Sequence, residues 1–258
     1  MVKSFSKGKL IMTDYKELLV SIDKKLNISC LHQQVQEVVN ILNCLDKKDI
    51  LPKAPAHIGF LPDEYDELFW KVSSEERVLL KQADNLLNNF RSYLSRSYGL
   101  WSLANLKTAR IIKDQYQVNT SLEVMGGNSY WSAAFDRIGV QAVSTDSMSW
   151  AKTSNTGNHR FYKTEQLDAQ NAIKKYREVD LVICCWAPNF GDSDLEVLTA
   201  FRKYNTHGIL LFIGEKDGAT NTAKFWEHAR IISSSKIRQV NQTFPNFDFI
   251  DEKIYEIK

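Results

Sequence analysis

The sequence is poor in the residues on which metal sites, disulfide-bonded domains and membrane spans depend. It has four cysteines and five histidines in 258 residues, and none of them falls into a metal-ligand spacing. The adjacent pair Cys184 and Cys185 lies in an apolar run, so we interpret these residues as buried reduced thiols, which suits a cytoplasmic protein. No stretch approaches the ~20 apolar residues of a membrane span, and residues 1–12 are too polar for a signal peptide.

An excess of one charge sign is also absent. Lys plus Arg total 33 against 31 for Asp plus Glu, so the net charge is only +2. A broad nucleic-acid-binding surface is therefore not expected, although a local basic patch stays open. Glycine and proline are scarce, at 11 and 5, whereas apolar residues make up 43%. This composition is typical of a globular protein with a sizeable core, and it leaves the oligomeric state open.

Residues 1–95 have helical periodicity. Apolar residues recur at spacings of three and four, most clearly after Ser73, where Leu79, Ala83, Leu86, Phe90 and Leu94 form one stripe. Ser73 and Glu76 make a capping box, and Gly99 is a natural stop. Between the helices, the proline-containing stretch at 49–65 is expected to be an extended connector. We therefore predict a helical N-terminal region over residues 1–95, which acts as a lid or selects the substrate.

From about residue 117 short apolar runs alternate with amphipathic stretches. The alternation predicts strands at 121–125, 140–146, 160–167, 180–186 and 208–214, with helices near 129–138, 168–178, 193–204 and 220–230. Such alternation predicts an α/β domain over residues 96–258, with a mostly parallel sheet covered on both faces. The runs at 229–240 and 247–258 are separated only by "NQTFPN", which predicts a closing antiparallel hairpin.

The stretch "LEVMGGNSYW" at 122–131 follows the first predicted strand. It resembles the "E/DxGxGxG" motif of class I S-adenosylmethionine (SAM) dependent methyltransferases, with Glu123 as the acidic residue and Gly127 as the middle glycine. Three further stretches resemble a bacterial and fungal branch of that family: "GGNSYWSAAFDRIGVQAVSTD", "DLVICCWAPN" and "FIGEKDGATNTAKFWEHA". The resemblance covers about residues 95–258, and it implies a Rossmann-like seven-stranded sheet whose C-terminal strand is antiparallel.

The resemblance also implies a set of SAM-binding residues. Asp146 ends the second strand and would accept hydrogen bonds from the ribose hydroxyls, because a carboxylate has two acceptor oxygens. The full set of implied cofactor contacts is Glu123, Gly126, Gly127, Asn128, Asp146, Met148, Asp168, Ala169 and Trp186. Three of these have a purely structural alternative: Glu123 holds loop N–H groups, Met148 packs in the core, and Asp168 caps a helix.

Two departures from the family motifs bear on activity. Met125 and Ser129 stand where the first and third glycines are expected, and replacing both by glycine is expected to tighten SAM binding. The "WPPY" stretch of the family reads Trp186, Ala187, Pro188 and Asn189 here, so its aromatic residue is missing. The catalytic residues stay unknown, with Glu215, Trp186 and Asn189 as candidates for contact with the acceptor.

Two functional hypotheses follow from the resemblance. The first is a SAM-dependent methyltransferase that acts on an unidentified acceptor. Methyl transfer depends mainly on positioning, so the lack of a conspicuous catalytic base does not count against it. The second is an inactive methyltransferase-like binding or scaffold protein that retains SAM or S-adenosylhomocysteine (SAH).

Overall fold

The described part of the N-terminal region is helical, as predicted. The computed structural model describes residues 7–258, so the first half of the stretch interpreted as too polar for a signal peptide lies outside it. Residues 7–98 form five helices: α1 (Lys7–Leu26), α2 (Ser29–Asp46), α3 (Pro62–Lys71), α4 (Ser74–Asn88) and α5 (Phe90–Tyr98). The connector runs over residues 47–61. Helix α3 starts at Pro62, because proline is tolerated in the first helical turn.

The capping signals around α4 and α5 are confirmed. The Ser73 hydroxyl accepts a hydrogen bond from the Glu76 N–H, and the Glu76 carboxylate accepts one from the Ser73 N–H. Gly99 ends α5 in the left-handed conformation at φ +67°. Ala83, Phe90 and Leu94 of the predicted stripe are buried, but Leu79 and Leu86 are only partly buried, and the next residues, Leu80 and Leu87, are the buried ones. The reason is tertiary, because α4 packs its face on α1.

The second half of the chain forms a seven-stranded sheet. Its strands are β1 (Thr120–Val124), β2 (Gln141–Asp146), β3 (Glu165–Gln166), β4 (Leu181–Cys185), β5 (Ile209–Glu215), β6 (Ile231–Ile232) and β7 (Glu252–Ile257). They lie in the order β3-β2-β1-β4-β5-β7-β6. β7 runs antiparallel to β5 and β6, and the other neighbours are parallel. This is the class I methyltransferase-like arrangement predicted from the motifs.

Two strand predictions were too long. The 160–167 run contributes only the two residues of β3, and residues 233–240 are not a strand. After the two residues of β6 the chain forms α11 (Ser235–Gln242), which Ser234 caps through the Ile237 N–H and which buries Ile237 and Val240 at helical spacing. The antiparallel pairing of β6 with β7 is confirmed, but the connection between them contains this helix instead of a short turn.

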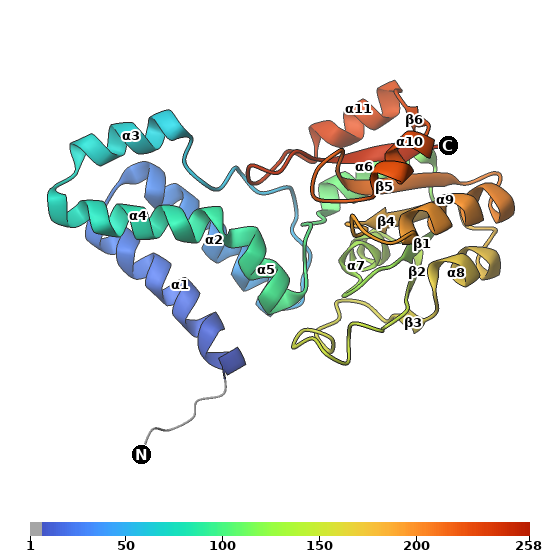
Figure 1. Cartoon of the computed structure of the whole chain (residues 1–258), viewed down its shortest axis with the longest axis horizontal. Helices are drawn as coiled ribbons and strands as arrows, with labels where there is room; N and C mark the ends of the chain where they lie inside the picture. The colour runs from blue at the N-terminus through green and yellow to red at the C-terminus, as the bar shows by residue number, and fades with distance from the viewer. Residues whose placement is uncertain (1–6) are drawn as a thin grey trace, which may run out of the picture.

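Helices cover both faces of the sheet. One face carries α6 (Leu106–Tyr116), α7 (Tyr130–Arg137) and α11, and the other carries α8 (Ala169–Lys175), α9 (Ser193–Tyr204) and α10 (Ala223–His228). Figure 1 shows α1 to α4 gathered to one side of this layered part, with α5 nearest to it. Within residues 7–258 no helix combines the length and apolar character needed to cross a membrane.

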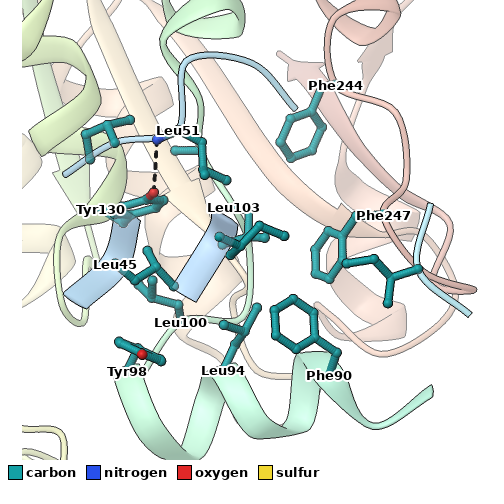
Figure 2. Close-up of a cluster of buried hydrophobic side chains, with 14 of the residues drawn as sticks. Leu45, Leu51, Phe90, Leu94, Tyr98, Leu100, Leu103, Tyr130, Phe244 and Phe247 are labelled. Atoms are coloured by element: carbon teal, nitrogen blue, oxygen red, sulfur yellow. Dashed lines mark hydrogen bonds between the residues drawn. The ribbon is translucent and has the colours of Figure 1, made fainter. Parts of the chain in front are cut away.

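The N-terminal helices share a hydrophobic core with one face of the sheet. A single buried cluster runs from Leu45 of α2 and Leu94 of α5 to Tyr130 of α7 and to Phe247 in the loop before β7. Figure 2 shows this junction, in which the Leu51 N–H donates a hydrogen bond to the Tyr130 hydroxyl at 3.3 Å. The shared core fixes α5 against the sheet, next to the site described below.

Candidate functional site

The loop after β1 keeps a left-handed backbone at alternate residues. Met125, Gly127 and Ser129 have φ values of +53°, +55° and +63°. These are the three positions at which the family motif has glycine, so the loop has the conformation of a glycine-rich loop although two of its side chains are not glycine. Gly126 is tied to a close approach, because a Cβ there would lie 2.5 Å from the Ser144 hydroxyl.

Met125 and Ser129 differ in what their side chains do. The Ser129 hydroxyl is fully buried and lies 2.7 Å from the Ser144 hydroxyl and 2.6 Å from the Thr164 hydroxyl. The Met125 sulfur lies 3.9 Å from the Cys184 thiol, and its side chain lines the cleft beside the loop. Ser129 therefore anchors the loop through its hydroxyl, whereas Met125 is partly buried, packs against the core and also borders the cleft.

Asp146, at the carboxyl end of β2, has three protein donors around its carboxylate. Oδ2 accepts from the Gly127 N–H at 2.9 Å, and Oδ1 accepts from the Met148 N–H at 2.7 Å and the Trp150 indole N–H at 3.0 Å. A carboxylate has about four acceptor positions. Roughly one therefore stays open in this conformation, and Trp150 holds the position that a second ligand hydroxyl would need.

The structure separates the remaining cofactor candidates. Asp168 caps α8, since its Oδ1 accepts from the Asn171 N–H at 3.0 Å, and it also lines the cleft next to Ala169. Hydrogen bonds to its carboxylate, of which the one from the Asn171 N–H has the largest effect, lower the pKa of Asp168. Asn128 lines the cleft as well, with its side-chain amide donating to the Tyr98 carbonyl at 2.6 Å. Met148 does not line the cleft: its side chain is buried, so core packing is its role and the adenine contact is not supported.

Glu123 lies buried beneath the loop, with 3% of its surface exposed. Its Oε2 accepts a hydrogen bond from the Ser132 N–H in the first turn of α7 at 2.7 Å. Burial raises the pKa of Glu123 to about 7, because the low-polarity surroundings disfavour the ionised form more than this hydrogen bond favours it. The carboxyl group therefore both organises the start of α7 and titrates near neutral pH.

This raised pKa predicts a pH-dependent stability. A carboxyl group whose pKa rises on folding from 4.5 to about 7 stabilises the fold fully below pH 4.5 and loses that contribution as the pH rises to 7. At about 1.4 kcal/mol per pH unit, the loss is on the order of 3 kcal/mol. Urea unfolding of Glu123→Gln is expected to show a smaller decline between pH 5 and pH 8 than wild type. A matched change at the exposed Glu178 should leave the wild-type profile intact, and equal profiles for all three proteins would contradict the prediction.

A cleft of about 1530 Å³ opens at this edge of the sheet. It is lined by the loop after β1, the ends of β2 and β4, the segment 147–159 and the end of α5. Small-molecule sites usually measure about 300–1,000 Å³. The cleft is therefore large enough to hold two small molecules side by side.

Trp186, just after β4, is held by a buried ionic network from the N-terminal region. Its indole N–H donates to Glu252 Oε1 at 2.6 Å, and the other oxygen of Glu252 accepts from the Arg91 guanidinium at 2.9 Å. Arg91 also binds both oxygens of Asp248, at 2.7 and 2.8 Å. The guanidinium carbon lies 4.9 Å from the centroid of the Trp186 ring. Helix α5 is thus connected directly to the end of β4.

Glu215 and Asn189 are not part of the cleft, so we withdraw them as candidates for acceptor contact. Both oxygens of Glu215 accept from backbone N–H groups, of Ala219 at 2.8 Å and of Asp251 at 3.2 Å, which closes the loop after β5. Asn189 is exposed and lies outside the cleft lining. Of the three residues, only Trp186 lines the cleft.

Sequence reasoning missed Trp150, Arg91 and Glu252. Trp150 stands four positions after Asp146, which is the only signal that the sequence offered for their contact. Arg91 and Glu252 are 161 positions apart, and no local pattern joins them. Among residues 7–258 no group of three or more His, Cys, Asp or Glu side chains is arranged to hold a metal ion.

Comparison with known proteins gives structural likenesses only. No protein-family model and no curated protein matches the sequence. The 1,6-didemethyltoxoflavin-N1-methyltransferase of Burkholderia thailandensis, solved with 1,6-didemethyltoxoflavin and SAH, is 12% identical; the match covers 65% of this chain and 86% of that one, with a TM-score of 0.41. A TehB-like SAM-dependent methyltransferase from Corynebacterium glutamicum is 13% identical over 69% of this chain and 98% of that one, with a TM-score of 0.39. Human N-acetylserotonin methyltransferase, solved with SAM, is 10% identical over 92% and 69%, with a TM-score of 0.38. The strand order of this chain itself defines its fold.

Proposed function

We propose that this chain binds SAM in the cleft at the ends of β1 and β2 and transfers its methyl group to a second molecule in the same cleft. The observation that carries the proposal is the left-handed backbone at 125, 127 and 129 beside the Asp146 carboxylate, in a cleft with room for two molecules. Parallel sheets bind ligands at the carboxyl ends of their strands, next to the order reversal, and β1 lies at that reversal.

The residues present fit SAM. Gly127 leaves open space at the loop, since a Cβ there would meet only Trp150, at 4.0 Å. Asp146 would receive a ribose hydroxyl on its open acceptor position, Asp168 and Ala169 would lie along the adenine, and Glu123 would face the ammonium group of the amino-acid end. Bound SAM supplies an activated methyl group on a sulfonium ion. The contribution of this chain is to hold both molecules in line and to exclude water.

The N-terminal region would select the acceptor. Tyr93, Ser95 and Arg96 of α5 line the cleft. We place the described part of residues 1–95 in this role, and residues 96–258 in the role of the SAM-binding domain. The four free cysteines, with burial raising the pKa of Cys184 and Cys185, support a reducing compartment such as the cytoplasm.

Thermal melting tests the proposal. Ligand at a hundred times its dissociation constant stabilises a fold by about 2.7 kcal/mol, so saturating SAM and SAH are each expected to raise Tm by several degrees. ATP, which shares the adenosine but not the methionine part, serves as the control and should have little effect. An unchanged Tm with both SAM and SAH would contradict SAM binding.

A second candidate function is an inactive SAM- or SAH-binding module. One observation favours it: Asp146 already receives the Trp150 indole, and Met125 fills space beside the loop. The two candidates share the binding site and differ in turnover. A protein that binds SAM but forms no SAH when an acceptor is present would be the inactive binding module.

The glycine variants of the two replaced positions should have different main effects, on SAM binding for Met125 and on stability for Ser129. Met125→Gly removes a left-handed strain of about 1–2 kcal/mol and clears the cleft, against an entropic cost of ~0.4–1 kcal/mol. We expect unchanged stability within about 1 kcal/mol and SAM affinity higher by about tenfold. Ser129→Gly removes a buried hydroxyl that has two partners, so it should lower stability by about 1–3 kcal/mol. Urea titration and calorimetry with SAH measure both; weaker binding by Met125→Gly would show that Met125 contacts the ligand.

A further inference from the structure

Two tryptophan rings form a stacked wall in the same cleft. The rings of Trp101 and Trp186 lie 5.3 Å apart between centroids with an interplanar angle of 16°. Both residues line the cleft, and Trp101 is the outer one, with 50% of its surface exposed. Phe190, at the rim of the same cleft, is 75% exposed. Large aromatic side chains exposed together in a cleft mark a binding surface more often than a structural one.

The wall is rigid because one buried arginine holds both of its members. Arg91 donates to the backbone carbonyl of Trp101, and it binds Glu252, which in turn accepts the indole N–H of Trp186. The backbone at Trp101 and the ring of Trp186 are thus held before any ligand arrives. A preorganised ring face gives a planar ligand its stacking energy without an ordering cost.

The charges around the cleft limit what can stack there. Its lining holds three carboxylates that count as negative charges, of Asp146, Asp168 and Glu196, and a single lysine or arginine, Arg96; Glu123 is not counted because burial raises its pKa. The Arg96 side chain already donates to the Ser92 carbonyl at 3.2 Å. An anionic ligand would meet more repulsion than attraction in such surroundings.

We infer that the methyl acceptor is a planar aromatic molecule that is neutral or cationic and stacks on the outer face of Trp101. This inference rests on the proposed function, because it gives part of the same cleft to the acceptor. Trp101 is the residue that determines specificity for the acceptor, and its indole together with that of Trp186 forms the stacking surface. Saturated and anionic molecules are excluded by shape and by charge respectively.

The experiment measures binding of three matched probes to the SAH-loaded protein by calorimetry. 1-Naphthylmethylamine is planar and cationic, 1-naphthoate is planar and anionic, and cyclohexylmethylamine is cationic and saturated. We expect 1-naphthylmethylamine to bind at least about tenfold more tightly than the other two, the scale of one aromatic stacking contact. Trp101→Leu should remove that preference, and Trp101→Tyr should restore most of it.

Controls separate this inference from the proposed function. Trp70 is 74% exposed on α3 and does not line the cleft, so Trp70→Leu should bind all three probes as wild type does. SAH binding to Trp101→Leu should be unchanged. A wild-type protein that binds SAH but none of the probes, or that prefers 1-naphthoate or the saturated amine, overturns the inference alone. Failure to bind SAH at all overturns the proposed function instead.

Discussion

Replacing Arg91 by methionine is expected to lower the free energy of unfolding by about 3–5 kcal/mol, the usual cost of removing one partner from a buried ionic network. The change leaves the carboxylates of Asp248 and Glu252 without their cation, and the side chain of Glu252 is only 2% exposed. It also removes the cation beside the Trp186 ring and the donor to the Trp101 carbonyl, so binding of a planar probe should weaken together with stability. Urea unfolding measures the first effect and calorimetry the second.

The matched control is a surface arginine in an ion pair. Arg137 lies 3.1 Å from Asp49, with both side chains about half exposed, so Arg137→Met should cost less than about 1 kcal/mol. The triple variant Arg91→Met, Asp248→Asn, Glu252→Gln removes the uncompensated charges and should recover part of the loss. A cost for Arg91→Met no larger than that for Arg137→Met would show that the network does not hold α5 to the sheet.

Replacing Asp146 by alanine is expected to weaken SAH binding by at least about tenfold, because one charge-assisted hydrogen bond to ribose contributes roughly 1.5–3 kcal/mol. The structure adds a cost that the sequence did not show. The Gly127 N–H, the Met148 N–H and the Trp150 indole all lose their acceptor, so stability should fall by about 1–3 kcal/mol as well. Calorimetry with SAH is therefore run well below the Tm of the variant.

Trp150→Phe is the control for the site at Asp146. It keeps the carboxylate and an aromatic ring but removes the indole N–H that occupies Oδ1. If the indole competes with ribose, this variant should bind SAH about three- to tenfold more tightly, the range of one net hydrogen bond. Wild-type affinity in both Asp146→Ala and Trp150→Phe would place the ligand away from Asp146.

Much of the second half of the chain could be predicted, because its signals are local. The apolar runs of β1, β2, β4 and β5 lie within one residue of their predicted bounds, and α9 was predicted at its observed residues, 193–204. Local signals also misled. Residues 229–240 have the pattern of one strand, yet Ser234 caps a helix there and most of the stretch forms α11. The 160–167 run gives only two strand residues, because only Glu165 and Gln166 pair with the neighbouring strand β2.

The candidate site was predictable where it depends on chain position and not where it depends on contacts. Glu123 and Asp146 lie at the carboxyl ends of β1 and β2, and Gly127 follows β1, so their proximity follows from the parallel arrangement. The same reasoning placed Glu215 at that edge, but its carboxylate is taken up by backbone N–H groups of its own loop and of Asp251 before β7. Trp150 was missed because nothing local specifies whether a tryptophan turns to solvent or to a carboxylate.

The sequence by itself determined the alternation of strands and helices, the capping of α4 and the residues at the strand ends, since each depends on neighbours a few positions away. Only the tertiary structure decided which face of α4 is buried, that Met125 adopts φ +53°, and that α5 reaches Trp186 through Arg91 and Glu252. These features depend on side chains up to 161 positions apart. Packing and desolvation act on distance in space, and the fold sets that distance.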